Sequence, residues 1–83
     1  MSDIRTILAD DAALVRGTIA QLLALEPDIE VLGEYGDGCA ALAAVRELGP
    51  DVAVLDVDMP GLDGIAVAEA IADTDTRVLI LSS

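Results

Sequence analysis

The sequence predicts an α/β fold with a parallel β-sheet, in the order β-α-β-α-β-α-β. Short runs of apolar and β-branched residues recur at regular spacing along the chain. Segments with helical spacing of apolar residues lie between them, and proline or glycine marks most boundaries. Strands that alternate with helices form parallel sheets with right-handed crossovers. These observations therefore predict a sheet that carries helices on its faces.

The predicted strands cover residues 4–9, 29–35, 52–55 and 78–81, and three of them are nearly continuous apolar runs. Such runs are typical of strands buried on both faces. Apolar stripes predict a helix in each interval. The stripes consist of Val15, Ile19, Leu22 and Leu23, then Leu42, Val45 and Leu48, then Ile65, Ala68 and Ile71. Pro27 follows the first helix, Gly49 ends the second, and Gly64 precedes the third.

Length and hydropathy limit the chain to one domain whose surface is unusually apolar. Its 83 residues lie below the common domain size of about 100–150. A hydrophobic fraction of 54% and a mean hydropathy of +0.61 are high for so short a chain. We therefore expect further material to cover part of its surface. No apolar run approaches the roughly 20 residues that span a membrane, and the N-terminus has no signal pattern. A cytoplasmic location is expected.

The net charge of −12 excludes several partners. The chain has sixteen acidic residues and four arginines, with no lysine or histidine. Such a surface repels phosphate groups, so we expect no direct nucleic-acid binding by this segment and no membrane binding. The single cysteine, Cys39, excludes an internal disulfide and a cysteine-based metal cluster. Its alanine-rich surroundings predict a small buried thiol.

Acidic residues gather where ligands bind in an open parallel sheet, at the carboxyl ends of the strands. Asp10 and Asp11 end the first predicted strand, Asp56 and Asp58 follow the third, and Ser82 ends the fourth. Clustered carboxylates either protonate or bind a cation, and all-oxygen ligands suit Mg²⁺. The absence of histidine argues against zinc.

An aspartate beside Mg²⁺ can attack a phosphoryl group and form an acyl phosphate. Ser82 is placed to donate a hydrogen bond to the transferred oxygens. Each residue also has a simpler interpretation. Asp10 or Asp11 alone suits an N-cap, Asp63 a turn or cap, Asp58 a solvated loop, and Ser82 a polar strand end. The coincidence of acids on two strand ends with a hydroxyl on a third favours the phosphoryl-transfer site.

Three segments, ILADDAALVR, VAVLDVDMPGLDGI and VLILSS, resemble the receiver domain of two-component response regulators. The short spacings and the ADD…R pattern are most similar to LuxR-type DNA-binding regulators. The resemblance implies a doubly wound, flavodoxin-like sheet of order 2-1-3-4-5. Residues 1–83 would then be a partial receiver domain, truncated after the fourth strand and lacking the fourth helix, the fifth strand and the fifth helix.

The same resemblance implies roles for the acidic residues. Asp56 would accept a phosphoryl group from a histidine kinase and also bind Mg²⁺. Asp11 and, through water, Asp10 would hold the metal, with the backbone carbonyl of Asp58. Ser82 would be the switch hydroxyl that moves to the phosphoryl group. In the parent protein this event would control a DNA-binding output domain.

Departures from the family pattern leave two further hypotheses open. Receivers carry a lysine on the fifth strand and an aromatic switch residue; this chain has no lysine, and Tyr35, its only aromatic residue, is on the second strand. VLDVD also resembles the D-x-D motif of haloacid-dehalogenase-type hydrolases, although that motif belongs on the first strand of their fold. An open fourth strand suggests a non-catalytic fragment that forms a homodimer or a swapped oligomer.

Overall fold

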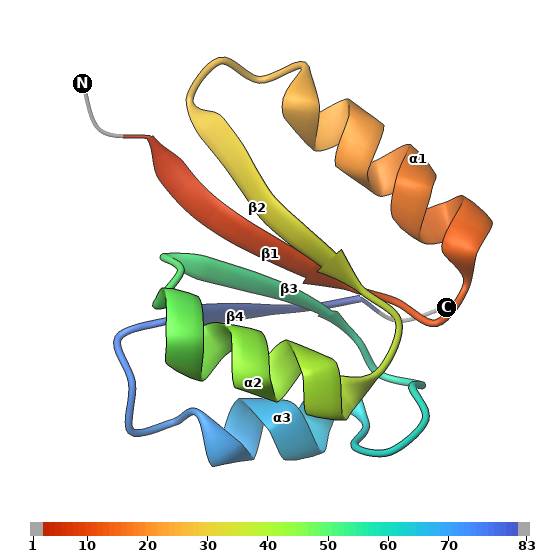
Figure 1. Ribbon diagram of the computed structural model, residues 1–83, viewed down its shortest axis with the longest axis vertical. Coiled ribbons are helices and arrows are strands. Elements are labelled where there is room, and N and C mark those ends of the chain that lie inside the picture. Colours follow the sequence, from red (N-terminus) through yellow and green to blue (C-terminus); the bar gives the residue numbers. More distant parts are fainter. Residues whose placement is uncertain (1–2, 82–83) are drawn as a thin grey trace.

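One parallel sheet organises residues 3–81, the part of the chain that this computed structural model describes (Figure 1). The strands lie in the order β2-β1-β3-β4. The elements are β1 (Ile4–Ala9), α1 (Ala13–Ala24), β2 (Ile29–Tyr35), α2 (Gly38–Leu48), β3 (Val52–Asp56), α3 (Gly64–Ala70) and β4 (Arg77–Leu81). The predicted order of elements and the parallel pairing are confirmed. β3 extends one residue further than predicted, and β4 begins one residue earlier.

Successive residues of the central strands face opposite sides of the sheet and belong to two separate cores. Ile7 and Leu55 pack with residues of α2 and α3 on one side. Leu8 and Val54 pack with Ala20 of α1 on the other. α2 packs against β1 and β2, α3 lies beside α2 and packs against β4, and α1 lies beside β2 (Figure 1). Helices therefore lie on both faces of the sheet, as the two-sided apolar strands predict.

The first apolar stripe is only partly buried, which corrects the prediction for α1. Val15 and Leu22 are 48% and 59% exposed, and the helix meets the sheet mainly through Ala20 and the half-buried Ile19. α1 packs chiefly against β2, so its other flank faces the uncovered side of β3 and β4. In the third stripe Ile65 is exposed, while Ile71 is buried just beyond the end of α3.

Local signals set the ends of α2 and α3. Asp37 caps α2 by accepting a hydrogen bond from the backbone N–H of Ala40 at 2.7 Å, and Asp63 caps α3 through Ala66 at the same distance. The cap predicted for Asp63 is thus confirmed. Gly49 ends α2 in the left-handed region at φ 55°, where a Cβ would be strained.

Cys39 is exposed, so the prediction of a buried thiol is wrong. The buried face of α2 is formed by Gly38, Ala41, Ala44 and Val45, and residue 39 falls outside it.

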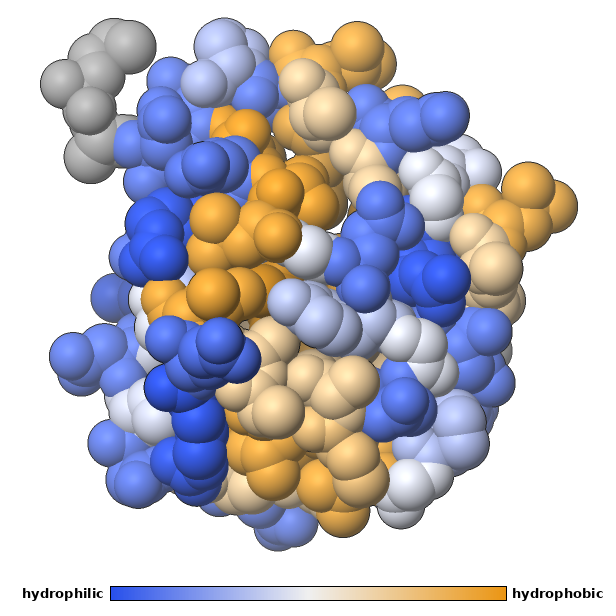
Figure 2. Space-filling model, in the orientation of Figure 1, coloured by the Kyte–Doolittle hydropathy of each residue, from blue (hydrophilic) through white to orange (hydrophobic). Residues whose placement is uncertain are grey.

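Figure 2 shows apolar side chains in a band down the face of the molecule seen in Figure 1, between margins of polar and charged residues. None of the helices in residues 3–81 is long and apolar enough to cross a membrane.

Candidate phosphoryl-acceptor site

Three carboxylates converge at the carboxyl edge of the sheet. Asp56 is the last residue of β3, and Asp10 and Asp11 follow β1 directly. One ligand oxygen of each lies within 4.8 Å of the others. Asp10 is buried, Asp56 is half-buried and Asp11 is exposed. The structure therefore brings together the three acids that the sequence placed at neighbouring strand ends.

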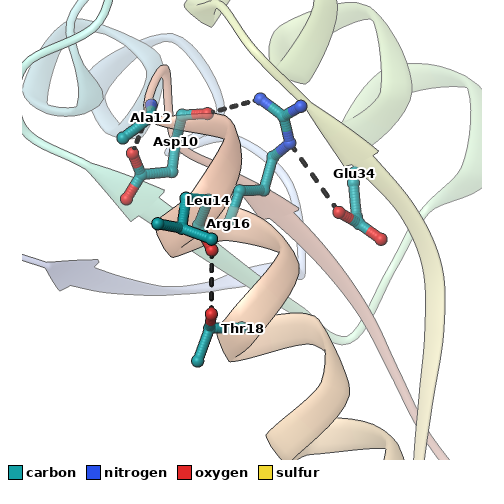
Figure 3. Close-up of polar contacts among 6 residues, drawn as sticks. All are labelled: Asp10, Ala12, Leu14, Arg16, Thr18 and Glu34. Atoms are coloured by element: carbon teal, nitrogen blue, oxygen red, sulfur yellow. Dashed lines mark hydrogen bonds and ion pairs between the residues drawn. The ribbon is translucent and has the colours of Figure 1, made fainter.

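Asp10 is held at its backbone and its side chain. Its N–H donates to the carbonyl of Tyr35 at 3.0 Å, and its own carbonyl accepts from Nη1 of Arg16 at 2.8 Å. Its Oδ1 accepts from the N–H of Ala12 at 2.8 Å (Figure 3). Ala12 is the N-cap of α1 and makes no side-chain cap, so the simpler interpretation of Asp10 or Asp11 as the cap is wrong. The second carboxylate oxygen of Asp10 remains for a ligand.

Longer hydrogen bonds hold the end of β3. Oδ1 of Asp56 accepts from the N–H of Asp58 at 3.3 Å, and the N–H of Val57 donates to the carbonyl of Leu81 at 3.1 Å. Gly64, the first residue of α3, lies so close that a Cβ there would overlap the Asp56 carbonyl. A glycine is needed at this point because the backbone of α3 packs directly onto the backbone at the end of β3.

Burial raises the pKa of Asp56 above its ordinary value, and the carboxylates of Asp10, Asp11 and Asp58 raise it further. The hydrogen bond from the Asp58 N–H acts in the opposite direction and lowers this pKa. Because negative neighbours oppose its ionisation, the Asp56 carboxylate is more stable with a cation nearby. Three converging carboxylates, with no nitrogen or sulfur ligand among them, fit Mg²⁺.

The acids form one wall of a hollow of about 430 Å³. The exposed Asp58 also lines it, and the rest of the lining is apolar, formed by Ala12, Val15, Ile19 and Leu81. Ser82, the predicted switch hydroxyl, lies outside the described residues. Sequence reasoning missed Gly64 as a packing contact and Arg16 as a partner of Asp10. The position of Gly64 just before a predicted helix was a usable signal, but no spacing rule links Arg16 to Asp10.

The family model of the response regulator receiver domain matches residues 6–83. The chain belongs to this family. Its fold agrees, because the four described strands have the predicted order and helices lie on both faces. Membership of the receiver family decides against the haloacid-dehalogenase hypothesis.

Relatives of this receiver come from two kinds of protein. A protein-glutamate methylesterase/protein-glutamine glutaminase of Nocardioides sp. is 41% identical over 81 residues, which is 98% of this chain and 22% of that protein. The "probable transcriptional regulatory protein NarL" of Mycobacterium tuberculosis is 42% identical over 82 residues, which is 96% of this chain and 38% of that protein. The receiver thus spans well under half of these curated relatives.

Solved receiver structures match closely. The signal receiver domain of NarL from Mycobacterium tuberculosis superposes with a TM-score of 0.95 at 40% identity, covering 99% of this chain and 68% of that structure. The response regulator domain of Thermotoga maritima CheB gives 0.92 at 36% identity, covering 98% and 61%. The flavodoxin-like receiver fold and the similarity to LuxR-type regulators are thereby confirmed.

Proposed function

We propose that this receiver accepts a phosphoryl group on Asp56 from a histidine kinase in the presence of Mg²⁺. The observation that carries the proposal is the half-buried carboxylate at the end of β3, within 4.8 Å of those of Asp10 and Asp11. The receiver acts as a phosphoryl-accepting switch, without turnover of an external substrate. Its cellular compartment would be the cytoplasm, with its kinase.

Asp56 is the nucleophile of the transfer. In its ionised form, a carboxylate oxygen attacks the phosphorus of a phosphohistidine; the new P–O bond forms as the P–N bond breaks. The bonding pair of that P–N bond leaves with the imidazole nitrogen. Asp58 donates its N–H to Oδ1 of Asp56, which orients the carboxylate and leaves Oδ2 without that contact. This orientation supports Oδ2 as the attacking oxygen.

Asp10, Asp11 and Asp56 would hold the metal, with the backbone carbonyl of Asp58. Bound Mg²⁺ would neutralise charge among the carboxylates and on the transferred phosphoryl oxygens. Ser82 would donate its hydroxyl to the phosphoryl group and so report phosphorylation to the neighbouring loops.

The output of the parent protein would lie in a separate domain. The match to NarL supports a DNA-binding output, and the match to methylesterases supports an enzymatic one at similar identity. In both cases the receiver segment itself would not contact DNA, since its net charge is −12. A mobility-shift assay at physiological salt would then show no complex between this chain and duplex DNA.

Labelling by acetyl phosphate tests the acceptor. We expect the intact mass to rise by one phosphoryl group only with Mg²⁺, and Asp56→Asn to abolish the increase. Asp63→Asn is the matched control, because Asp63 caps α3 outside the carboxylate cluster and asparagine also caps helices. Labelling that persists in Asp56→Asn would show that another residue is the acceptor.

A further inference from the structure

Arg16 links α1 to the turn that contains Asp10 and Asp11, here called the acidic turn. Its side chain extends from the first turns of α1, and Nη1 donates to the carbonyl of Asp10 at 2.8 Å (Figure 3). Nε lies 3.7 Å from Oε1 of Glu34 on β2, which is too long for a hydrogen bond. Arg16 does not line the acidic hollow. The strongest contact that the structure gives its guanidinium is therefore the one to Asp10.

The position of this cation is unusual for the chain. Three of the four arginines lie at the opposite edge of the sheet. Arg5 donates to the carbonyls of Leu48 and Gly49, Arg46 donates to that of Ala70, and Arg77 begins β4. The sequence has no lysine or histidine, and within residues 3–81 Arg16 is the only basic side chain at the carboxyl edge.

Packing keeps Arg16 in this place. Its side chain is 23% exposed, and a Cβ on the neighbouring Gly36 would lie 3.2 Å from Nη1. Nε is buried without a hydrogen-bond partner among the described residues. A partly buried guanidinium whose Nε has no partner has few alternative positions, so its bond to the Asp10 carbonyl is a strong restraint.

We propose that Arg16 is a positioning residue for the Mg²⁺ site, an inference that rests on the proposed function. By fixing the Asp10 carbonyl, it sets the orientation of the peptide between Asp10 and Asp11, and with it the direction of both carboxylates towards Asp56. Without Arg16 the turn would sample other orientations, and metal binding would have to restore this one. Supporting contacts of this kind commonly change metal affinity by about 10–100-fold.

Arg46 supplies a matched control. It too donates to a backbone carbonyl, that of Ala70 at 2.7 Å, and it lies near a carboxylate, Asp73, at 3.9 Å. These contacts are remote from the cluster of Asp10, Asp11 and Asp56. Substituting Arg16 or Arg46 by glutamine thus removes the same charge and the same kind of contact at opposite edges of the sheet.

The first measurement uses the full chain without metal. Backbone amide exchange is followed by NMR for Ala12, whose N–H bonds to Oδ1 of Asp10. We expect Arg16→Gln to speed exchange at Ala12 roughly tenfold, as loss of one charge-assisted hydrogen bond implies, and Arg46→Gln to leave it unchanged. Unchanged exchange in Arg16→Gln would overturn the positioning role whatever the metal does.

The second measurement is Mg²⁺ titration by calorimetry. Arg16→Gln should raise Kd about tenfold, Arg16→Lys less, and Arg46→Gln not at all. Arg16→Lys keeps the test available if the glutamine variant does not fold. Equal Kd values for all variants would overturn the inference and leave Asp56 as acceptor. A wild-type chain that bound no Mg²⁺ would instead overturn the proposed function and the Mg²⁺ role of Arg16 with it.

Discussion

At the scale of single residues, Asp56 is less stable as a carboxylate in the folded chain than in the unfolded one. Burial is the main cause, and the carboxylates of Asp10, Asp11 and Asp58 add to it. A raised pKa means that folding opposes ionisation of this group. The arrangement lowers the stability of the fold and prepares a place for a cation.

Stability should therefore depend on pH through Asp56. The folded state bears no cost from this group below the unfolded pKa near 3.8, and loses stability as pH rises from there through the raised folded pKa. We expect Asp56→Asn to exceed wild type in free energy of unfolding at neutral pH and to converge with it in acid. Urea titrations followed by circular dichroism measure this. A difference that is constant with pH would contradict this pH dependence. Added Mg²⁺ should raise the free energy of unfolding of wild type only.

Gly64 should be intolerant of any side chain, because a Cβ would overlap the carbonyl of Asp56. We expect Gly64→Ala to destabilise the fold by about 1–3 kcal/mol and to weaken Mg²⁺ binding. Gly17 of α1 is the control, since a Cβ there meets nothing within 4 Å. Gly17→Ala should stabilise the helix by roughly 0.5–1 kcal/mol. Equal unfolding free energies for the two variants would refute close packing at Gly64.

At the scale of elements, α2 depends on its N-terminal cap. Its first turn contains no acidic residue, so Asp37 alone supplies a carboxylate there. We expect Asp37→Ala to lower the free energy of unfolding by about 1 kcal/mol, and Asp37→Asn to change it much less, because asparagine caps equally well. Chemical denaturation of the three proteins compares these values. A full loss in Asp37→Asn would point to charge rather than capping.

The sequence predicted the positions of the helices and strands better than it predicted which of their side chains are buried. Strand positions followed from apolar runs, and the three converging acids followed from the carboxyl-end rule together with parallel pairing. The burial of α1 was not predictable, since Val15 and Leu22 have helical spacing but lie on a flank that no described element covers. The contact between Arg16 and Asp10 depends on how a long side chain folds back over a turn, which periodicity does not encode.

At the scale of the whole molecule, one side of the sheet is open. Leu79 of β4 is 56% exposed and Leu22 of α1 is 59% exposed, and in the described sheet β4 pairs with β3 alone. Exposed apolar side chains beside a free strand edge favour association with a second chain. The homodimer or swapped oligomer expected from the sequence stays a prediction.

Light scattering tests this association. We expect the average mass of the chain to rise with concentration and Leu79→Glu to suppress the rise. Ile65→Glu is the control, because Ile65 is 48% exposed on α3, which packs on the other face of the sheet. A monomer at every concentration would contradict the prediction.

Tyr35 gives the molecule an internal optical reporter. It is the only aromatic residue of the chain, and its carbonyl accepts the N–H of Asp10 at 3.0 Å. With no tryptophan present, all intrinsic ultraviolet fluorescence arises from the phenol of this residue, whose backbone is hydrogen-bonded to Asp10. If cation binding or phosphorylation of Asp56 moves Asp10, we therefore expect the strand end that carries Tyr35 to shift with it and the emission of the unlabelled protein to change.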